Sequence, residues 1–169
     1  MIYRQNYATS DGFDDMVMIS DGEKLTGLLF TGSEDILKFS LPENETSLPV
    51  FDKTKEWLDE YFGGEIPSFT PDLCVSALSP FQKTVSGIMM GIPYGKTMTY
   101  GEMATIIAKE RGIKRMSARA VGGAVGANPI YIIIPCHRVL GAHGAITGYG
   151  GGIKNKENLL KLEKIPFHH

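Results

Sequence analysis

Short apolar runs separated by turn-forming residues characterise the first part of the chain. Residues 16–20, 23–31 and 36–40 each favour a β-strand, and Asp-Gly and Gly-Ser pairs divide them. The pattern predicts a hairpin or a small meander. In residues 48–62 the apolar side chains recur at helical spacing until a Gly-Gly pair ends the run, which predicts a helix. Residues 64–79 contain two prolines and several Ser and Thr, and are expected to be an extended linker.

The second part of the chain contains three sequence signals for the start of a helix. A Ser-Pro pair opens an apolar-faced helix over residues 80–92, and Thr99 and Glu102 form the capping box of a second helix. Ser117 can cap a third helix over residues 118–127. Two short helices joined by a basic turn make a candidate helix-turn-helix.

An uninterrupted apolar run follows these helices. Residues 131–134 are expected to form a buried strand that delivers Cys136 at its end, where Pro135 breaks the hydrogen-bond ladder. A closing helix is expected over residues 154–163. The first part is therefore expected to be α/β and the second part mainly α.

Composition fits a globular protein of one large or two small domains, with 169 residues of which 43% are hydrophobic and 21% charged. No apolar run approaches the roughly 20 residues of a membrane helix, and no signal segment opens the chain, so we expect a cytoplasmic protein. The two cysteines, Cys74 and Cys136, come without a Cys-x-x-Cys motif or a Cys/His cluster. We therefore expect neither a disulfide framework nor a metal site.

The charge changes sign between the two parts. Residues 1–79 carry 5 Lys+Arg and 15 Asp+Glu, whereas residues 80–169 carry 12 and 4. Such asymmetry hints at nucleic-acid contact, because a basic surface gains affinity by releasing counterions from phosphates. Two solvated faces that differ in charge are the competing explanation.

Residues 118–127 form a slim segment, in which only Arg119 carries a long charged side chain. Its three glycines weaken an isolated helix by about 1 kcal/mol each relative to Ala, so close approach to another surface is the expected reason for them. That surface is either a neighbouring core helix or the minor groove of DNA. A lone guanidinium could fill the space that an extruded base leaves.

Cys136 is the candidate nucleophile. A thiol reacts as the thiolate, whose unperturbed pKa is near 8.5, so it needs a base or a positive charge nearby. His137 and Arg138 are the obvious candidates, although neighbouring residues of an extended chain point to opposite faces. His137 therefore reaches the sulfur only through a kink at Pro135 or a relaying water. A buried, inert thiol is the alternative.

A series of motifs runs through the second part: Ser79-Pro80-Phe81, Ile92-Pro93-Tyr94-Gly95, Thr99-Tyr100-Gly101-Glu102, Ala118-Arg119-Ala120-Val121-Gly122-Gly123-Ala124, Asn128-Pro129, Pro135-Cys136-His137-Arg138-Val139 and Gly148-Tyr149-Gly150-Gly151. In this order they resemble the O6-alkylguanine-DNA alkyltransferase family over roughly residues 79–165. Residues 54–63 are similar to the family more weakly.

The resemblance implies a small α/β, ribonuclease H-like domain over residues 1–78 and a winged helix-turn-helix-like domain over residues 79–169. It implies DNA repair by a suicide methyltransferase. An O6-alkylguanine is flipped out of double-stranded DNA, and its alkyl group moves irreversibly to Cys136. A monomer that binds the minor groove without a cofactor is expected. The alternatives are an alkylated-DNA binding protein without chemistry and a cysteine hydrolase.

The resemblance also implies roles for individual residues. Cys136 would accept the alkyl group, His137 would take the thiol proton through a water, and Glu163 would orient that histidine. Tyr100 would donate a proton to the leaving guanine, and Asn128 would tie the recognition helix to the active-site turn.

Two further groups of residues follow from the same resemblance. The guanine pocket would be formed by Val139, Tyr149, Gly150 and Gly151. The DNA contacts would come from an intercalating finger, Arg119, and from Ala118, Ala120, Gly122, Gly123 and Ala127. Some family members bind zinc in the amino-terminal domain, but residues 1–79 contain no suitable Cys/His set, so no metal is expected.

Overall fold

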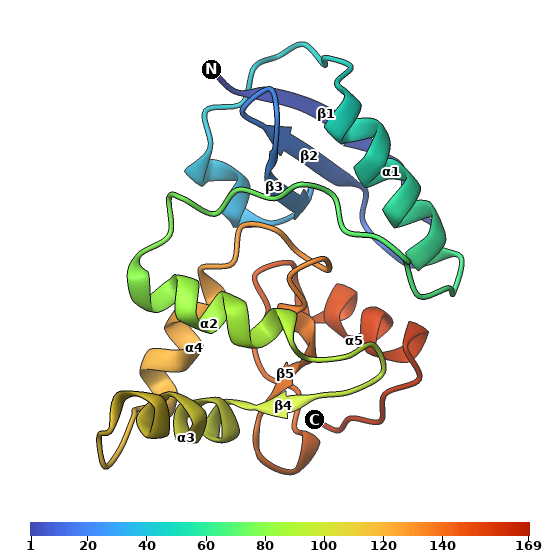
Figure 1. The fold of residues 1–169 in the computed structure, drawn as a ribbon. Coiled ribbons are helices and arrows are strands. Elements are labelled where there is room, and N and C mark those ends of the chain that lie inside the picture. The colour runs from blue at the N-terminus through green and yellow to red at the C-terminus, as the bar shows by residue number, and fades with distance from the viewer.

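The molecule has a sheet-containing half and a helical half, which Figure 1 shows one above the other. The computed structural model describes all of residues 1–169. The first half contains β1 (Tyr3–Tyr7), β2 (Met16–Ser20), β3 (Leu25–Phe30), the 3-10 helix η1 (Glu34–Lys38) and α1 (Pro49–Phe62). The second half contains α2 (Pro80–Met90), β4 (Met98–Thr99), α3 (Tyr100–Arg111), α4 (Ala118–Gly126), η2 (Cys136–Arg138), β5 (Val139–Leu140), η3 (Ala142–Gly144) and α5 (Ile153–Leu162). The chain is therefore a mixed α and β protein.

The three strands form an antiparallel sheet in the order β1-β2-β3, and α1 packs against it (Figure 1). Every residue of the central strand β2 is buried. The strands expected within residues 16–20 and 23–31 and the helix expected over 48–62 are confirmed. The edge strand β1 was not expected, because its sequence Tyr-Arg-Gln-Asn-Tyr is largely polar and only half-buried.

The prediction of a strand over residues 36–40 is wrong. The chain forms η1 there, beginning where the Ser33 hydroxyl accepts a hydrogen bond from the amide of Asp35. Such local bonding between a side chain and the backbone competes with strand pairing. Leu37 is 86% exposed, whereas Ile36 and Phe39 are partly buried and pack against the core.

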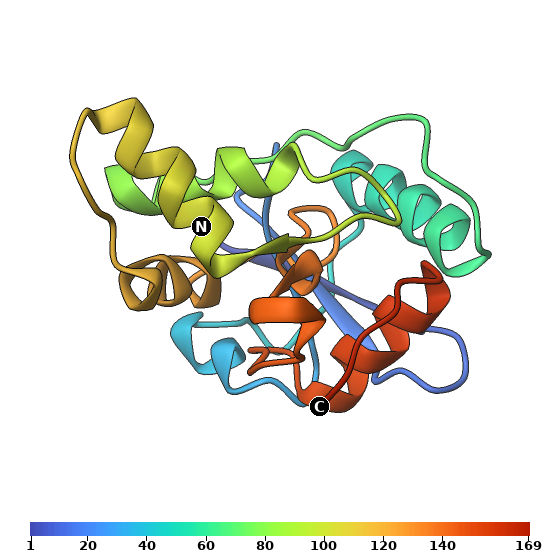
Figure 2. The ribbon, with the colours of Figure 1, turned by 90° about the horizontal axis from the view of Figure 1, so that it is seen from below.

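The three helix starts expected in the second half are confirmed. Ser79 and Thr99 each open a helix with a complete capping box, and Ser117 caps α4 by accepting from the amide of Ala120. Figure 2 shows α2, α3 and α4 grouped on one side of the molecule and α5 on the other. The short strands β4 and β5 pair in parallel between them.

Residues 131–134 are buried as expected, but they form turns and not a strand. Ile132 has a φ of 68°, a left-handed conformation that is rare for a β-branched residue. The turn is fastened to β3, since the Leu28 amide donates to the Pro129 carbonyl at 2.9 Å and the Tyr131 amide donates to the Leu28 carbonyl at 2.8 Å. The edge of the sheet in the first half thus positions the segment that leads into η2.

One hydrophobic core runs through both halves. A continuous cluster of 31 buried residues takes side chains from β2, β3 and α1 as well as from α2, α3 and α4. A smaller cluster of Leu140, Leu160 and Ile165 joins β5 to α5. None of the helices has both the length and the apolar character that crossing a membrane would require.

Candidate active site

Cys136 opens η2 and lies beside a cavity of about 530 Å³. Its side chain is only 5% exposed, so a reaction partner reaches the sulfur through this cavity. The lining comes from α3, α4, the turn after α4 and the glycine-rich loop: Tyr100, Ala118, Arg119, Gly122, Val125, Gly126, Asn128, Tyr131, Cys136, Thr147, Gly148, Tyr149 and Gly150. The cavity thus brings together the expected nucleophile, the expected proton donor and part of the expected DNA-binding helix.

The thiol of Cys136 is protonated at rest. Burial raises its pKa to about 11, and the opposing effects of Asn128, Lys156 and Tyr149 do not outweigh that burial. The sulfur must therefore lose its proton during a reaction. Lys156 is the cation that favours the thiolate, whereas Arg138, which the sequence suggested, bonds elsewhere.

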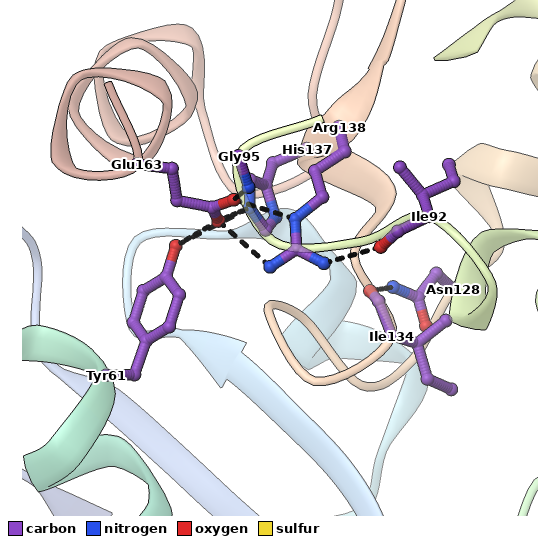
Figure 3. Close-up of polar contacts among 8 residues, drawn as sticks. All are labelled: Tyr61, Ile92, Gly95, Asn128, Ile134, His137, Arg138 and Glu163. Carbon is purple, nitrogen blue, oxygen red and sulfur yellow. Dashed lines mark hydrogen bonds and ion pairs between the residues drawn. The ribbon is translucent and has the colours of Figure 1, made fainter. Parts of the chain in front are cut away.

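His137 is completely buried, and its two ring nitrogens have different surroundings (Figure 3). Nε2 lies 2.6 Å from Oε2 of Glu163, whereas the buried Nδ1 makes no hydrogen bond to the protein. An imidazole that donates from Nε2 to Glu163 keeps the lone pair of Nδ1 free to accept a proton. Burial lowers the pKa of His137, which favours this neutral form. Because η2 is a 3-10 turn, the chain at Cys136 is kinked and not extended.

Glu163 follows α5 and is held by donors from separate parts of the chain (Figure 3). Tyr61 of α1 donates to Oε2 at 2.6 Å, and the amide of Gly95 donates to Oε1 at 2.9 Å. Arg138 donates from Nε to Oε1 at 2.8 Å and from Nη2 to Oε2 at 3.2 Å. Burial alone would raise the pKa of Glu163, but His137 and Arg138 outweigh it and hold the pKa below the ordinary value of 4.5.

Asn128 fastens the turn that precedes Cys136. Its Nδ2 donates to the carbonyls of Ile130 at 3.1 Å and Ile134 at 2.8 Å, and its Oδ1 accepts from the amide of Ile130 at 3.0 Å. The side chain therefore connects the end of α4 to the turn, the arrangement that the expected hinge role requires.

Three tyrosines line the cavity: Tyr100, Tyr131 and Tyr149. The hydroxyl of Tyr100 lies 3.0 Å from Oγ1 of Thr147, and burial raises its pKa, so the phenol keeps its proton. The ring of Tyr149 lies 5.4 Å from that of Tyr131, and its buried hydroxyl makes no hydrogen bond. Burial and then the neighbouring Cys136 raise the pKa of Tyr149.

The helix α4 presents small residues to open space. Ala118, Arg119 and Gly122 line the cavity. A Cβ added at Gly123 or Gly126 would meet nothing within 4 Å. Packing inside the protein therefore does not require these two glycines, which favours an external surface over a neighbouring helix as the reason for them.

The other expected pocket and DNA-binding residues do not line the cavity. Ala120 is exposed on α4, and Ala127 is half-buried at the end of that helix. Gly151 is buried beneath the loop, where an added Cβ would lie 2.6 Å from the ring of Tyr149. Val139 is buried in β5.

Several residues of the site were not expected from the sequence. Lys156 is 1% exposed, and its Nζ donates to the Val139 carbonyl at 2.9 Å and contacts that of Gly148 at 3.5 Å. Tyr61 had only the pattern of a core residue in an amphipathic helix. Thr147 lies in a loop without a distinctive motif. No group of three or more His, Cys, Asp or Glu side chains is arranged to hold a metal ion.

The fold and the site define a class: a mixed α and β protein in which a buried cysteine lies at a cavity beside a slim exposed helix. Residues 80–165 match the family described as 6-O-methylguanine DNA methyltransferase, DNA binding domain. The methylated-DNA–protein-cysteine methyltransferase of Haemophilus influenzae is 40% identical over 152 residues, which are 90% of this chain and 82% of that protein. That of Methanosarcina acetivorans is 41% identical over 150 residues, covering 80% of this chain and 90% of the relative.

A solved structure is similar over nearly the whole chain. The crystal structure of Mycobacterium tuberculosis OGT in complex with DNA is 36% identical, with a TM-score of 0.78, and the match covers 96% of this chain and 92% of the other. The chain belongs to the 6-O-methylguanine DNA methyltransferase family.

Proposed function

We propose that this protein repairs O6-alkylguanine in double-stranded DNA by moving the alkyl group to Cys136, once per molecule. Family membership supports the reaction, and one observation supports the assignment of residues: the sulfur shares its cavity with Tyr100 and with Arg119 of α4. Because Cys136 is only 5% exposed, its sulfur is out of reach of a base stacked in a duplex. The guanine must therefore leave the stack and enter the cavity.

The nucleophile is generated by proton transfer. The thiol proton of Cys136 moves through a water to Nδ1 of His137, the ring nitrogen that has no protein partner. The ionised Glu163, bonded to Nε2, stabilises the resulting imidazolium. The thiolate then attacks the carbon bonded to O6 of guanine. The S–C bond forms as the C–O bond breaks, and the electron pair of that bond departs with the guanine.

Tyr100 assists the departure of the guanine. Its raised pKa keeps the phenol protonated, so it can donate to the ring as negative charge develops there. Tyr149 and Gly150 form the wall that holds the flipped base, and Gly151 lies beneath the ring of Tyr149. The Val139 carbonyl, to which the family resemblance assigns the exocyclic amine of guanine, accepts from Nζ of Lys156 at 2.9 Å.

DNA contact is assigned to α4, which would lie in the minor groove. Arg119 would fill the gap that the flipped base leaves, while the small residues allow close approach: Ala118, Ala120, Gly122, Gly123 and Ala127. Minor-groove contact carries little sequence information, which suits a protein that searches for damage.

We assign residues 1–78 to a ribonuclease H-like domain and residues 79–169 to a winged helix-turn-helix-like domain. The sheet with α1 supports the first assignment, and the succession of α3 and α4 supports the second. A monomer in the cytoplasm, working without a cofactor or a metal, remains the expectation from the sequence.

Counting transfer events tests the proposed function. The protein is incubated with a duplex that contains O6-methylguanine and is then analysed by mass spectrometry. We expect one methyl group per molecule on the peptide containing Cys136, and none in Cys136→Ser. Binding without any transfer would identify a non-catalytic binding protein. Many turnovers on an acyl substrate would identify a hydrolase.

A further inference from the structure

The first half of the chain reaches the cavity through a small polar cluster. The Ser33 hydroxyl donates to the carbonyl of Gly150 at 2.7 Å and lies 2.8 Å from the hydroxyl of Tyr131. The Tyr131 hydroxyl in turn donates to the carboxylate of Asp35. Ser33 and Asp35 belong to the start of η1, whereas Tyr131 and Gly150 line the cavity. Ser33, Asp35 and Tyr131 are called the wall cluster below.

The glycine-rich loop lies tightly against this cluster. A Cβ added at Gly150 would lie 2.6 Å from Oδ2 of Asp35 and 2.9 Å from the hydroxyl of Tyr131. The absence of a side chain at Gly150 thus lets the loop backbone come within bonding distance of Ser33. Ser33 and Tyr131 are enclosed, at 7% and 1% exposed, whereas the side chain of Asp35 is 18% exposed and pairs with Lys38 at 3.0 Å.

The ring of Tyr149 packs against Tyr131, but few other polar contacts hold this part of the loop. Gly148, Tyr149 and Gly150 line the cavity, and all three lie outside helices and strands. Two polar contacts join their carbonyls to other segments. Ser33 donates to the carbonyl of Gly150, and Nζ of Lys156 lies 3.5 Å from the carbonyl of Gly148. The bond of 2.7 Å from Ser33 is the shorter and better formed.

We propose that Ser33 and Asp35 are positioning residues, which hold the loop wall of the cavity through Tyr131 and Gly150 and so set how large an alkyl group is transferred. This inference rests on the proposed function. A fixed wall keeps a small alkyl group in line with the sulfur, because displacement of a reacting carbon by a fraction of an ångström already slows transfer. When the loop is no longer held by Ser33 and Asp35, a bulky alkyl group has more room, but a methyl group is less well aligned with the sulfur of Cys136.

A purely structural role for the cluster predicts a different result. Loss of stability would lower the amount of folded protein and would slow the transfer of every alkyl group in proportion. The ratio of two transfer rates, measured on the same preparation, is unaffected by such a loss. This ratio therefore separates positioning from simple stabilisation.

The test compares single-turnover rate constants on duplexes that contain O6-methylguanine or O6-benzylguanine. In Ser33→Ala and in Asp35→Ala we expect the benzyl-to-methyl ratio to rise about 5- to 10-fold, the effect of losing one hydrogen bond in the wall. Glu34→Ala is the matched control, since Glu34 is exposed between the two residues, and it should leave the ratio unchanged.

A further variant provides the same test if Ser33→Ala or Asp35→Ala does not fold. Tyr131→Phe keeps the buried ring and removes only the hydroxyl, so it should raise the ratio to a similar extent. The double variant Ser33→Ala/Tyr131→Phe should show the ratio of a single variant and not the product of both, because the two residues belong to one hydrogen-bonded network through Asp35.

The outcomes distinguish this inference from the proposed function. If the wild-type protein transfers no alkyl group, the proposed function itself is wrong. If the wild type is methylated, but the ratio stays within about twofold of its value in every folded cluster variant, a difference too small for a lost hydrogen bond, only the positioning role is wrong.

Discussion

The hydroxyl of Tyr61 donates a 2.6 Å hydrogen bond to Oε2 of Glu163, the oxygen that also bonds Nε2 of His137. Tyr61 belongs to α1 in the first half of the chain, and His137 belongs to η2 in the second. The first half thus contributes directly to the carboxylate that orients the proposed base. A buried carboxylate with so many donors is rigid, because breaking one bond leaves a polar group unpaired in apolar surroundings.

Tyr61→Phe is expected to lower the free energy of unfolding by about 1.5–3 kcal/mol, the value of a hydrogen bond to a charged group. It should also slow methyl transfer several-fold, because Glu163 then orients His137 less firmly. Urea unfolding and single-turnover assays measure the two effects. Tyr94→Phe is the control, since Tyr94 packs its ring 6.1 Å from that of Tyr61. A destabilised Tyr61→Phe with the wild-type rate would limit Tyr61 to a role in the fold.

Stability should fall in acid through Glu163. Its pKa is lowered in the folded protein, so its contribution is complete above the ordinary value of 4.5 and is lost as the pH falls below that value. Urea midpoints measured at decreasing pH should show this loss. Glu163→Gln, which leaves Arg138 buried without a counter-charge, should cost about 3–5 kcal/mol near neutral pH and have a shallower acid slope. An acid slope equal to that of the wild type would contradict the assignment.

The two cysteines should differ in their reaction with iodoacetamide when no DNA is bound. Hydrogen bonds to Ser76 lower the pKa of the half-exposed Cys74, whereas burial raises that of Cys136 to about 11. Near neutral pH we expect Cys74 to be modified first, and modification of Cys136 to accelerate as the pH approaches its pKa. Near neutral pH Lys156→Met should slow Cys136 further, because it removes the charge that favours the thiolate; well above pH 8 the two proteins should react alike, since burial lowers the pKa of Lys156 to about 8. Peptide mass spectrometry follows both sites, and faster reaction of Cys136 at neutral pH would refute the protonated resting state.

Gly123→Ala separates helix stability from DNA contact. Because the added methyl meets no protein atom, the substitution should raise the free energy of unfolding by about 0.5–1 kcal/mol. It should nevertheless weaken binding to duplex DNA if α4 lies against the minor groove. Fluorescence anisotropy at fixed salt measures the affinity. Gly87→Ala is the matched control, since Gly87 lies in α2 with equally open space around its Cα, and it should leave DNA affinity unchanged.

Arg119→Ala tests the finger role. The variant should lose much more activity on duplex substrate than on free O6-benzylguanine, since only the duplex requires a group to replace the flipped base. Transfer rates on the two substrates give the comparison, and the free base serves as the internal control. Equal losses on both would show that Arg119 acts in the cavity and not on the DNA.

Signals that act within a few residues were sufficient for much of the fold. The helix caps at Ser79, Thr99 and Ser117 placed three helices correctly, because each is a bond between a side chain and a backbone amide three residues away. The apolar run 131–134 was assigned wrongly for a related reason. Burial could be read from its composition, but its turn conformation depends on Asn128 and on pairing with β3.

The sequence by itself determined the family, the cysteine, the adjacent histidine and the slim helix, since each is carried by a contiguous motif. Only the tertiary structure decided that Tyr61 bonds Glu163, that Lys156 is buried near the sulfur, and that Ser33 supports the cavity wall. These contacts join residues far apart in the chain. Their hydrogen bonds depend on how the two halves pack around one core, and no local pattern of residues specifies that packing.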